Sequence, residues 1–374
     1  FYLWHRRLAL WVLIPILVFS LSGLLHPLMR LTRPEAAQMF FPPPVWPADL
    51  KGPALIEPDL SVAGLRPVKL GDDWVQQQWT TRTHPSQFVS LVTGLPIEHG
   101  AQDYAEQLAR FYVGDQQSEI AVIRFVTQFD AEYGEINRLL PVWMVEFRRD
   151  DQLRVYIDIR QDRLATLSDD TRRLLLQLFQ WGHVWSFLDE DDPLRNALFI
   201  LMMSACTLLG LSGVYLFVVL PISKRRNARG RKVHAWGGLL ISMALLMFVV
   251  SGLVRTVEKL IPEVRGVPLA ESIALNTVSY DFTQLKQRFS AIQGVRLHRL
   301  DREAVWQISQ PRQPDQWVNA TTGQSIEQGA LAFAQRVAAN ANASSRTQAL
   351  VSSERIHNFK ADGDYGFIDK RLPV

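Results

Sequence analysis

The sequence has little cysteine and little net charge, and both shortages exclude classes of protein. Cys206 is the one cysteine among 374 residues, so the chain has no internal disulfide, no cysteine-ligated zinc site and no iron–sulfur cluster of its own. No Cys-x-x-Cys-His motif occurs, which excludes covalently attached c-type haem. The formal net charge is only +3, so no overall basic field favours a nucleic-acid partner.

Long apolar runs, by contrast, occur three times. A helix that crosses a lipid bilayer needs about 20 predominantly apolar residues. Residues 8–25 and 196–223 contain no charged side chain, and residues 233–254 contain only His234 as an ionisable group. No small-x-small cleavage site follows the first run, so we expect a retained transmembrane helix there and not a signal peptide.

The positive charges predict how the chain lies in the membrane. Residues 224–232, KRRNARGRK, carry six positive charges in a short loop, which the positive-inside rule places in the cytoplasm. The N-terminus then also lies inside, and the long segments lie outside, in the periplasm if this is a Gram-negative bacterial protein. The predicted order is transmembrane helix 1 at 1–30, periplasmic domain 1 at 31–194, transmembrane helix 2 at 195–223, a cytoplasmic basic loop at 224–232, transmembrane helix 3 at 233–255 and periplasmic domain 2 at 256–374.

The chain also repeats itself. TGLPIEHGAQDYA at 93–105 resembles TGQSIEQGALAFA at 322–334, with an offset of 229 residues. At that offset, His5 and the following Ser-Gly-Leu of the first apolar run match His234 and the Ser-Gly-Leu of the third. EYGEINRLLPV at 132–142 resembles DYGFIDKRLPV at 364–374. We infer two copies of a helix, an exterior domain and a returning helix. Because the second copy stops inside a repeated block, we expect further chain, with a fourth helix, after Val374.

The exterior segments have the patterns of an α+β fold. Ala101, Tyr104, Ala105 and Leu108 share one face of a predicted helix, and the alternating apolar residues of 153–159 predict a strand. Residues 87–94 and 316–323 are also expected to contain strands, each followed by a Thr-Gly turn. The predicted fold class is an α+β membrane protein: a transmembrane helix bundle, three helices seen and a fourth expected, with two repeated extracytoplasmic α+β domains that each have a small antiparallel sheet.

Four of the eight histidines lie at the ends of the predicted membrane helices. His5 and His234 are at the cytoplasmic ends of helices 1 and 3, His26 ends helix 1 outside, and His183 precedes helix 2 on that same side. One interpretation makes them polar residues of the membrane interface. The other notes that two histidines at each face are the number that ligates one haem iron at each face. His5 and His26 would be about 31 Å apart along a straight helix.

The repeat suggests how these histidines would pair. His5 and His234 are equivalent, so one haem could bind between them. Arg255 stands where the second copy would have its counterpart of His26, so the partner of His26 is expected to be His183. Arg255 then either pairs with a haem propionate or extends its charge to the interface.

Aromatic residues and further histidines surround these candidates. Trp181 and Trp185 flank His183 and either line the haem or a substrate surface, or belong to an interfacial aromatic belt. The remaining histidines lie in exterior segments without metal-type spacing, and we expect them at the surface: His84, His99, His298 and His357.

These motifs resemble a known family. The paired His…Ser-Gly-Leu helices, the Thr-Gly turns followed by a helix, and RLLPVW at 138–143 with strands after it resemble the PepSY-associated transmembrane family over nearly the whole chain. FYLWHRRLALWVLIPILVFSLSGLLHPL and WGHVWSF resemble its FoxB-like siderophore-iron reductases. The resemblance implies an inner-membrane protein with two non-covalent b haems that reduces ferric siderophores in the periplasm. It also implies haem ligands at His5, His26, His183 and His234.

Other features bound the predicted activity. No flavin or nicotinamide motif is visible, so the electrons would come from a quinol or a separate reductase, and no catalytic residue can be assigned. Two alternatives stay open. One is a non-enzymatic PepSY-type sensor or peptidase-modulating protein, and the other is a siderophore transporter built on membrane repeats.

Overall fold

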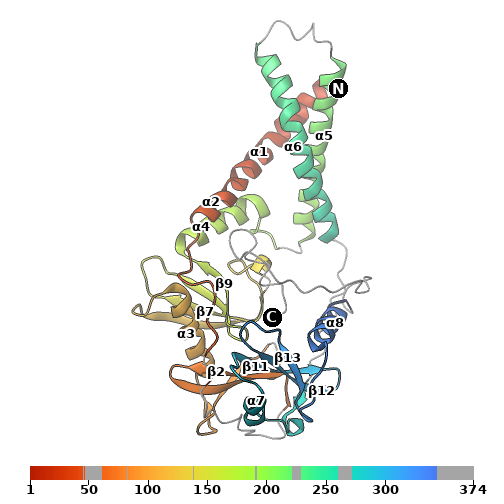
Figure 1. Cartoon of the computed structure of the whole chain (residues 1–374). Coiled ribbons are helices and arrows are strands. Elements are labelled where there is room, and N and C mark those ends of the chain that lie inside the picture. The colour runs from red at the N-terminus through yellow and green to blue at the C-terminus, as the bar shows by residue number, and fades with distance from the viewer. Residues whose placement is uncertain are drawn as a thin grey trace. The chain divides into compact units, whose positions relative to one another are not determined.

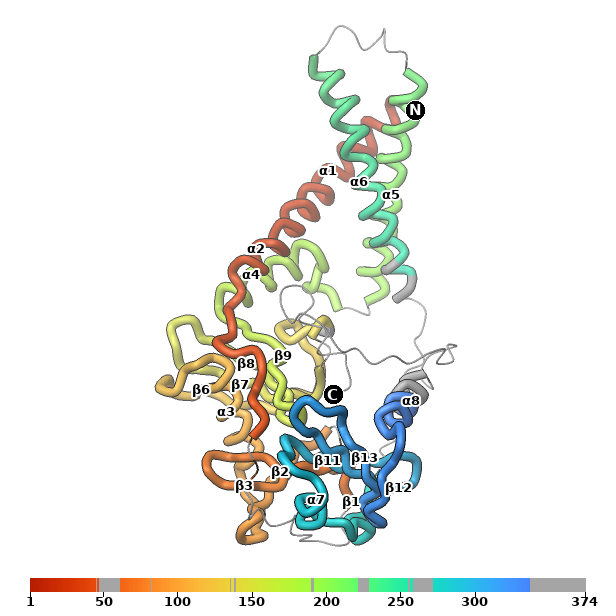
Figure 2. Tube along the Cα trace, viewed as in Figure 1, coloured from red at the N-terminus to blue at the C-terminus, as the bar shows by residue number. Residues whose placement is uncertain are grey.

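A computed structural model describes residues 1–44, 46, 61–81, 83–137, 139–189, 192–220, 229–259 and 272–342. The chain divides into two compact units, shown as ribbon and trace in Figures 1 and 2. Phe1–Thr32 and Thr171–Glu263 form the first, and we call it the helical unit. Arg33–Asp170 and Val264–Val374 form the second, and we call it the sheet unit.

Three helices of the helical unit are long and apolar enough to cross a membrane. The candidate spans are Tyr2–Leu31, Pro193–Val219 and Arg229–Val254, so length and composition indicate a multi-pass membrane protein, as predicted. The elements of the unit are α1 (Tyr2–Gly23), α2 (Leu25–Leu31), α4 (Asp170–Phe179), the π-helix η2 (Gln180–Val184), α5 (Pro193–Val219) and α6 (Arg229–Lys259). Residues 224–228 of the predicted basic loop lie outside the described residues, and residues 229–232 belong to α6.

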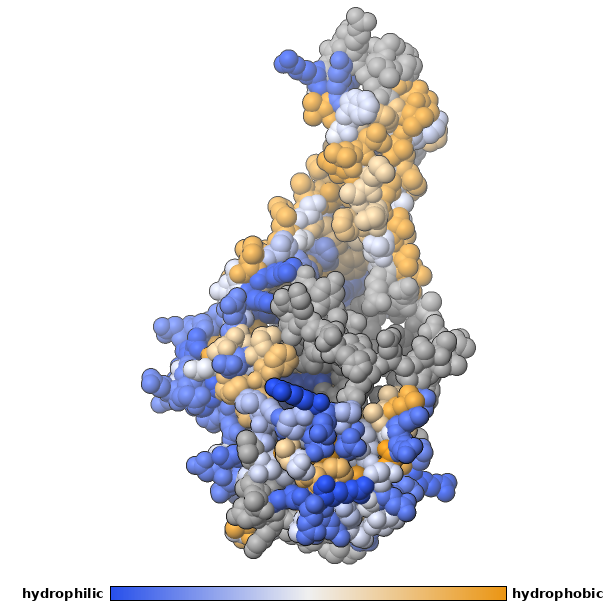
Figure 3. Space-filling view, viewed as in Figure 1, coloured by the Kyte–Doolittle hydropathy of each residue, from blue (hydrophilic) through white to orange (hydrophobic). Residues whose placement is uncertain are grey.

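The surface of these helices is suited to lipid. Trp11, Ile14, Leu201 and Phe248 are among many large apolar side chains that remain exposed on the three spans. Figure 3 shows this apolar surface in orange along the helices. Trp11, for example, is 83% exposed. A continuous apolar surface of this kind would be unfavourable in water and indicates contact with lipid or another protein.

The helical unit has a small interior of its own. Val12 of α1, Met202 and Cys206 of α5, and Val249 of α6 are buried together. The start of α5 is fixed locally, because the carboxylate of Asp192 accepts a hydrogen bond of 2.8 Å from the Leu194 amide, and Pro193 occupies the first turn, where it needs no amide partner.

The sheet unit contains a seven-stranded antiparallel sheet to which both copies of the repeat contribute. Its order is β13-β12-β11-β2-β3-β4-β5. The strands are β2 (Gly64–Leu70), β3 (Asp73–Trp79), β4 (Gln87–Ser90), β5 (Pro96–Ile97), β11 (Gly294–Leu300), β12 (Glu303–Ser309) and β13 (Gln316–Asn319). The copies meet where β2 pairs with β11, with Leu65 opposite Leu297. The sequence predicted a small sheet for each domain, and the structure instead joins the two into one.

The same elements recur in both copies at the predicted offset. β4 and β13 are 229 residues apart, and so are α3 (Gly100–Val113) and α8 (Gly329–Asn342). The predicted Thr-Gly turns contain Gly94 and Gly323, both with a φ of 75°, a left-handed conformation that glycine adopts without a steric penalty. The predicted buried face of α3 is confirmed, because Ala101, Tyr104 and Leu108 are fully covered.

A second, four-stranded sheet belongs to the first copy. Its order is β6-β7-β8-β9, and its strands are β6 (Ile120–Val126), β7 (Val142–Phe147), β8 (Arg154–Asp158) and β9 (Arg163–Ser168). β8 confirms the strand predicted from alternating apolar residues. Helix α3 packs against both sheets, since Phe88, Tyr104 and Val155 belong to one core. The repeated block at 364–374 lies outside the described residues.

The other face of the long sheet has a separate core. Helix α7 (Phe282–Arg288) covers it, and Phe282 packs against Trp306 with Leu65 and Leu297 nearby. Four short elements complete the unit: β1 (Ser61–Val62), β10 (Ile273–Ala274), η1 (Glu135–Asn137) and η4 (Leu275–Thr277).

Candidate functional site

His5 and His234, from α1 and α6, lie close together in the helical unit. Their ring centres are 6.4 Å apart and their planes make an angle of 64°. Two imidazoles that bind one metal ion on opposite sides, each about 2 Å from nitrogen to metal, have ring centres about 6 Å apart. Either ring can rotate about its own metal–nitrogen bond, so the angle does not oppose ligation. The separation therefore suits two axial ligands of one metal centre.

The third helix of the bundle holds the ring of His5. Its Nδ1 lies 2.9 Å from Oγ of Ser212, on α5. The same hydroxyl donates to the Leu209 carbonyl at 2.9 Å. A serine hydroxyl carries a single hydrogen, so when that hydrogen is directed to the Leu209 carbonyl the bond to His5 uses the imidazole hydrogen on Nδ1. Neutral His5 then has its proton on Nδ1, and its Nε2 lone pair is free to bind a metal.

Close approach of α5 to this ring depends on a glycine. A Cβ at Gly213 would lie 3.2 Å from Cε1 of His5, tighter than an ordinary contact. The Ser-Gly pair at 212–213 thus provides both the hydrogen-bond acceptor and the room for the imidazole.

His26 and His183, the second predicted pair, share an aromatic neighbour. The ring of Phe179 stacks on His183 with centres 4.8 Å apart and planes 16° apart. The same ring contacts His26 edge-on, with centres 5.5 Å apart. Stacking covers the face of an imidazole, whereas a metal binds in the ring plane at a nitrogen, so Phe179 leaves the ligand nitrogen of His183 uncovered.

His183 is held by a serine in the same manner as His5. Its Nδ1 lies 3.2 Å from Oγ of Ser22, on α1, and that hydroxyl donates to the Phe19 carbonyl at 3.1 Å. When the Ser22 hydrogen is directed to the Phe19 carbonyl, the proton between the imidazole and the hydroxyl is on Nδ1 of His183, and the lone pair is on Nε2. Burial lowers the pKa of His183, against an opposing hydrogen bond to the Phe19 backbone, and this favours the neutral imidazole that binds metals.

The π-helix that carries His183 is fixed at its end by Arg195. Both Nε and an Nη of this buried side chain donate to the Val184 carbonyl, at 3.0 and 2.8 Å. Gly182 permits the contact with α1, because a Cβ there would lie 2.9 Å from Cβ of Ser22. A one-turn π-helix widens the backbone locally and is frequent at functional sites.

The two tryptophans beside His183 differ in environment. Trp185 is partly buried and stacks on Phe199 of α5 with ring centres 4.6 Å apart. Trp181 is 53% exposed. Arg255 lies within α6, and its side chain is outside the described residues, so the choice between a propionate partner and an interfacial charge stays open.

Sequence reasoning missed the residues that support the histidines. Ser22, Ser212 and Phe179 contact a histidine side chain, Arg195 donates to the carbonyl of Val184 next to His183, and none of the four was predicted. One signal was present: the Ser-Gly pair occurs in the first run and again in GLSGVY at 210–215, where small residues are also typical of close helix packing.

Among the described residues, the other histidines do not gather as a second site. His84 and His99 are exposed, as predicted, and His357 lies outside the described residues. The prediction was wrong for His298, which lies against Trp317 and Phe333 at 5.7 and 4.7 Å between ring centres. Its Nε2 is 2.8 Å from the Gln307 side chain, and burial lowers the pKa of His298 to about 4.

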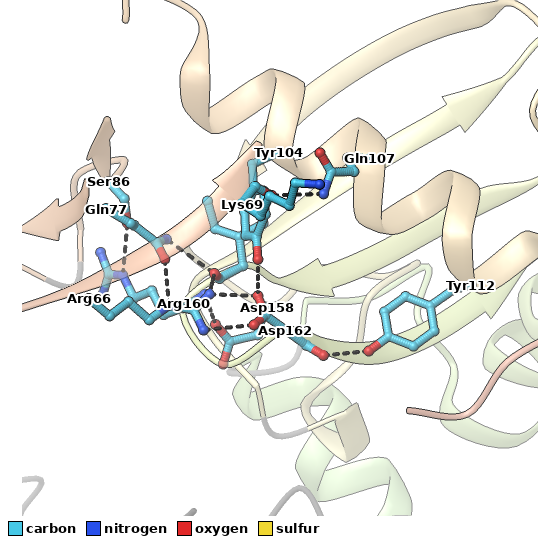
Figure 4. Close-up of polar contacts among 11 residues, drawn as sticks. Arg66, Lys69, Gln77, Ser86, Tyr104, Gln107, Tyr112, Asp158, Arg160 and Asp162 are labelled. Atoms are coloured by element: carbon cyan, nitrogen blue, oxygen red, sulfur yellow. Dashed lines mark hydrogen bonds and ion pairs between the residues drawn. The ribbon is translucent and has the colours of Figure 1, made fainter. Parts of the chain in front are cut away.

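Figure 4 shows a dense polar network in the sheet unit that has a structural role. Arg66 on β2 binds both carboxylate oxygens of Asp162, at 2.7 and 2.5 Å, and donates to Gln77 at 2.8 Å. Tyr104 and Tyr112 of α3 donate to Asp162 as well, to its carboxylate and its carbonyl. Burial lowers the pKa of the Arg66 guanidinium, but the charge of Asp162 outweighs it and the net shift is upward. The network thus ties the β8–β9 turn to the long sheet and to α3.

Within the described residues, no group of three or more His, Cys, Asp and Glu side chains gathers as a metal site.

Comparison with known proteins gives no relative. No protein-family model, curated protein or solved structure matches the chain. What the fold and the site define is a class: a multi-pass α+β membrane protein with paired histidines among its long helices.

Proposed function

We propose that the protein is an inner-membrane reductase with two non-covalent b haems. It would pass electrons from a quinol or a separate reductase to a ferric siderophore in the periplasm, and so release Fe(II). His5 and His234 would ligate one haem near the cytoplasmic face, and His26 and His183 would ligate the other near the periplasmic face. The N-terminus would lie in the cytoplasm and the sheet unit outside.

One observation carries the proposal. The ring centres of His5 and His234 are 6.4 Å apart, the separation expected of two ligands of one iron. Nδ1 of His5 is bound to Ser212, which leaves Nε2 for the metal. The chain brings these groups together from three helices, α1, α5 and α6, although they lie far apart in the sequence.

The second pair supports the proposal in a different way. His183 has its Nδ1 bound to Ser22, and the carbonyl of the next residue, Val184, accepts a hydrogen bond from Arg195. His26 is exposed and contacts Phe179, so it supplies the less constrained ligand.

The chemistry suits iron release. Haem supplies one-electron chemistry when bound, while the protein sets the axial ligands, the hydrogen bonds to them and the burial. Siderophores hold Fe(III) through hard oxygen ligands, and Fe(II) is the softer, less charged ion, so reduction weakens the complex.

A pyridine haemochrome assay on detergent-purified, haem-loaded protein tests the proposal. We expect about two haems per chain, one for each pair of histidines. His234→Ala should lose one haem because it removes one axial ligand of the first pair. His99→Ala is the matched control, since His99 is exposed in the sheet unit.

Other outcomes would redirect the assignment. A stoichiometry near zero in the wild type would refute a haem protein and leave the sensor and transporter interpretations. A stoichiometry near one would mean that a single pair binds haem. The dithionite-reduced protein should be reoxidised by a ferric siderophore, and a His183→Ala protein that has lost a haem yet reacts at the wild-type rate would contradict the role of the second pair.

A further inference from the structure

Each of the three long helices contains a Ser-Gly pair: Ser22-Gly23 on α1, Ser212-Gly213 on α5 and Ser251-Gly252 on α6. In every case the serine hydroxyl donates to the carbonyl three residues earlier in its own helix. The distances are 3.1 Å from Ser22, 2.9 Å from Ser212 and 2.8 Å from Ser251. With the single hydrogen of each hydroxyl directed to that carbonyl, the oxygen is left to accept a further hydrogen bond.

Two of the three serines accept that bond from a histidine. Ser212 is bound to Nδ1 of His5, and Ser22 to Nδ1 of His183. Ser251 is exposed, and among the described residues it has no histidine partner. The same local motif is thus present with a histidine in two places and without one in the third.

We infer that Ser212 and Ser22 are positioning residues that keep His5 and His183 in the Nδ1–H tautomer, so that Nε2 is presented as the metal-binding atom. This inference rests on the proposed function for the identity of the metal centre. The tautomer itself is a property of the chain alone.

The physical reason is that a neutral imidazole can place its proton on either nitrogen. A proton on Nε2 would block ligation, and a fixed acceptor at Nδ1 removes that state. A hydrogen bond from Nδ1–H also orients the ring and raises the basicity of Nε2.

The direct test is nitrogen NMR of the full-length protein labelled with ¹⁵N-histidine, recorded before haem is loaded. His5→Gln and His183→Gln spectra assign the two signals. We expect Nδ1–H tautomers for both residues in the wild type. Ser212→Ala should give His5 a mixture of tautomers, Ser22→Ala should do the same for His183, and Ser212→Thr should restore His5 by restoring the hydroxyl. Ser251→Ala is the matched control and should change neither signal.

The haem-loaded protein provides the second measurement. Loss of a hydrogen bond to a metal-ligating histidine typically weakens metal binding about 10- to 100-fold, so Ser212→Ala should retain haem at least about 10-fold less tightly than Ser251→Ala. Its midpoint potential should rise, because a less basic imidazole stabilises Fe(III) less.

The two ideas can fail separately. A wild-type protein that binds no haem refutes the proposed function, while the NMR spectra still decide the role of the serines. Nε2–H tautomers in the wild type, or an unchanged His5 signal in Ser212→Ala, would overturn the inference even if two haems are bound.

Discussion

The two copies of the repeat share a framework but differ where polar side chains are buried in the sheet unit. Arg66 in the first copy and Arg296 in the second are equivalent, and the pairing of Leu65 with Leu297 places them opposite each other across β2 and β11. Arg66 has a carboxylate, Asp162, bound through two nitrogens. Arg296 has no hydrogen-bond or ion-pair partner among the described residues. Burial lowers the pKa of Arg296 to about 10, and the charge of Arg66 adds to this effect.

The neighbouring positions differ as well. Val68 in the first copy is a core residue, and its equivalent in the second is His298. Gln77 donates to a backbone carbonyl and accepts from Arg66, whereas its equivalent Gln307 bonds to His298 and to Asp315. The comparison shows that apolar contacts and glycines maintain the shared fold, while each copy satisfies its buried polar groups in its own way.

The largest expected difference between the copies concerns the arginines. Arg66→Met should lower the free energy of unfolding by about 3–5 kcal/mol, because it leaves the partly buried carboxylate of Asp162 without its cation. Arg296→Met should be neutral or stabilising, since no bound carboxylate loses a partner and a desolvated charge is removed. Urea unfolding of the full-length chain in detergent, followed by tryptophan fluorescence, measures both. Equal destabilisation by the two substitutions would contradict the comparison.

A smaller effect is expected from acid at His298, a histidine that the first copy lacks at the equivalent position. The pKa of His298 is about 4 in the folded chain and 6.5 when exposed. Since the folded state binds this proton less readily, stability falls as the pH drops from 6.5 towards 4, by at most about 3 kcal/mol. His298→Val introduces the residue that the first copy has at the equivalent position. It should make the free energy of unfolding less dependent on pH between 6.5 and 4. His99→Gln, at an exposed position, should leave the pH dependence as in the wild type, and an unchanged slope in His298→Val would disprove the assignment.

The smallest difference is expected where the copies are alike. A Cβ at Gly100 would lie 2.5 Å from Cβ of Phe88, and one at Gly329 would lie 2.5 Å from Cβ of Trp317. Gly100→Ala and Gly329→Ala should therefore each destabilise by about 1–3 kcal/mol, because helix and strand must separate. Thermal unfolding of the two variants should give similar shifts, and a large effect in one copy alone would show that the helices α3 and α8 pack differently.

Much of the fold could be predicted because it depends on local patterns. Apolar runs located the three long helices, and the four-residue face of α3 and the alternation in β8 were legible from spacing alone. The repeat located the Thr-Gly turns in both copies. The union of the two sheets through β2 and β11 was not predicted, because strand partners that are more than 200 residues apart leave no local signal.

The candidate site also has features that the sequence predicts and features that depend on long-range contacts. The sequence alone determined which histidines stand at the ends of apolar helices, because position in a run fixes depth in a membrane helix. Only the tertiary structure decided that His5 meets His234, that Ser212 and Ser22 hold the imidazoles, and that His298 is packed between aromatic rings. These are contacts between separate elements, and the hydrogen on Nδ1 is fixed by a hydroxyl that the sequence places far from the ring it holds.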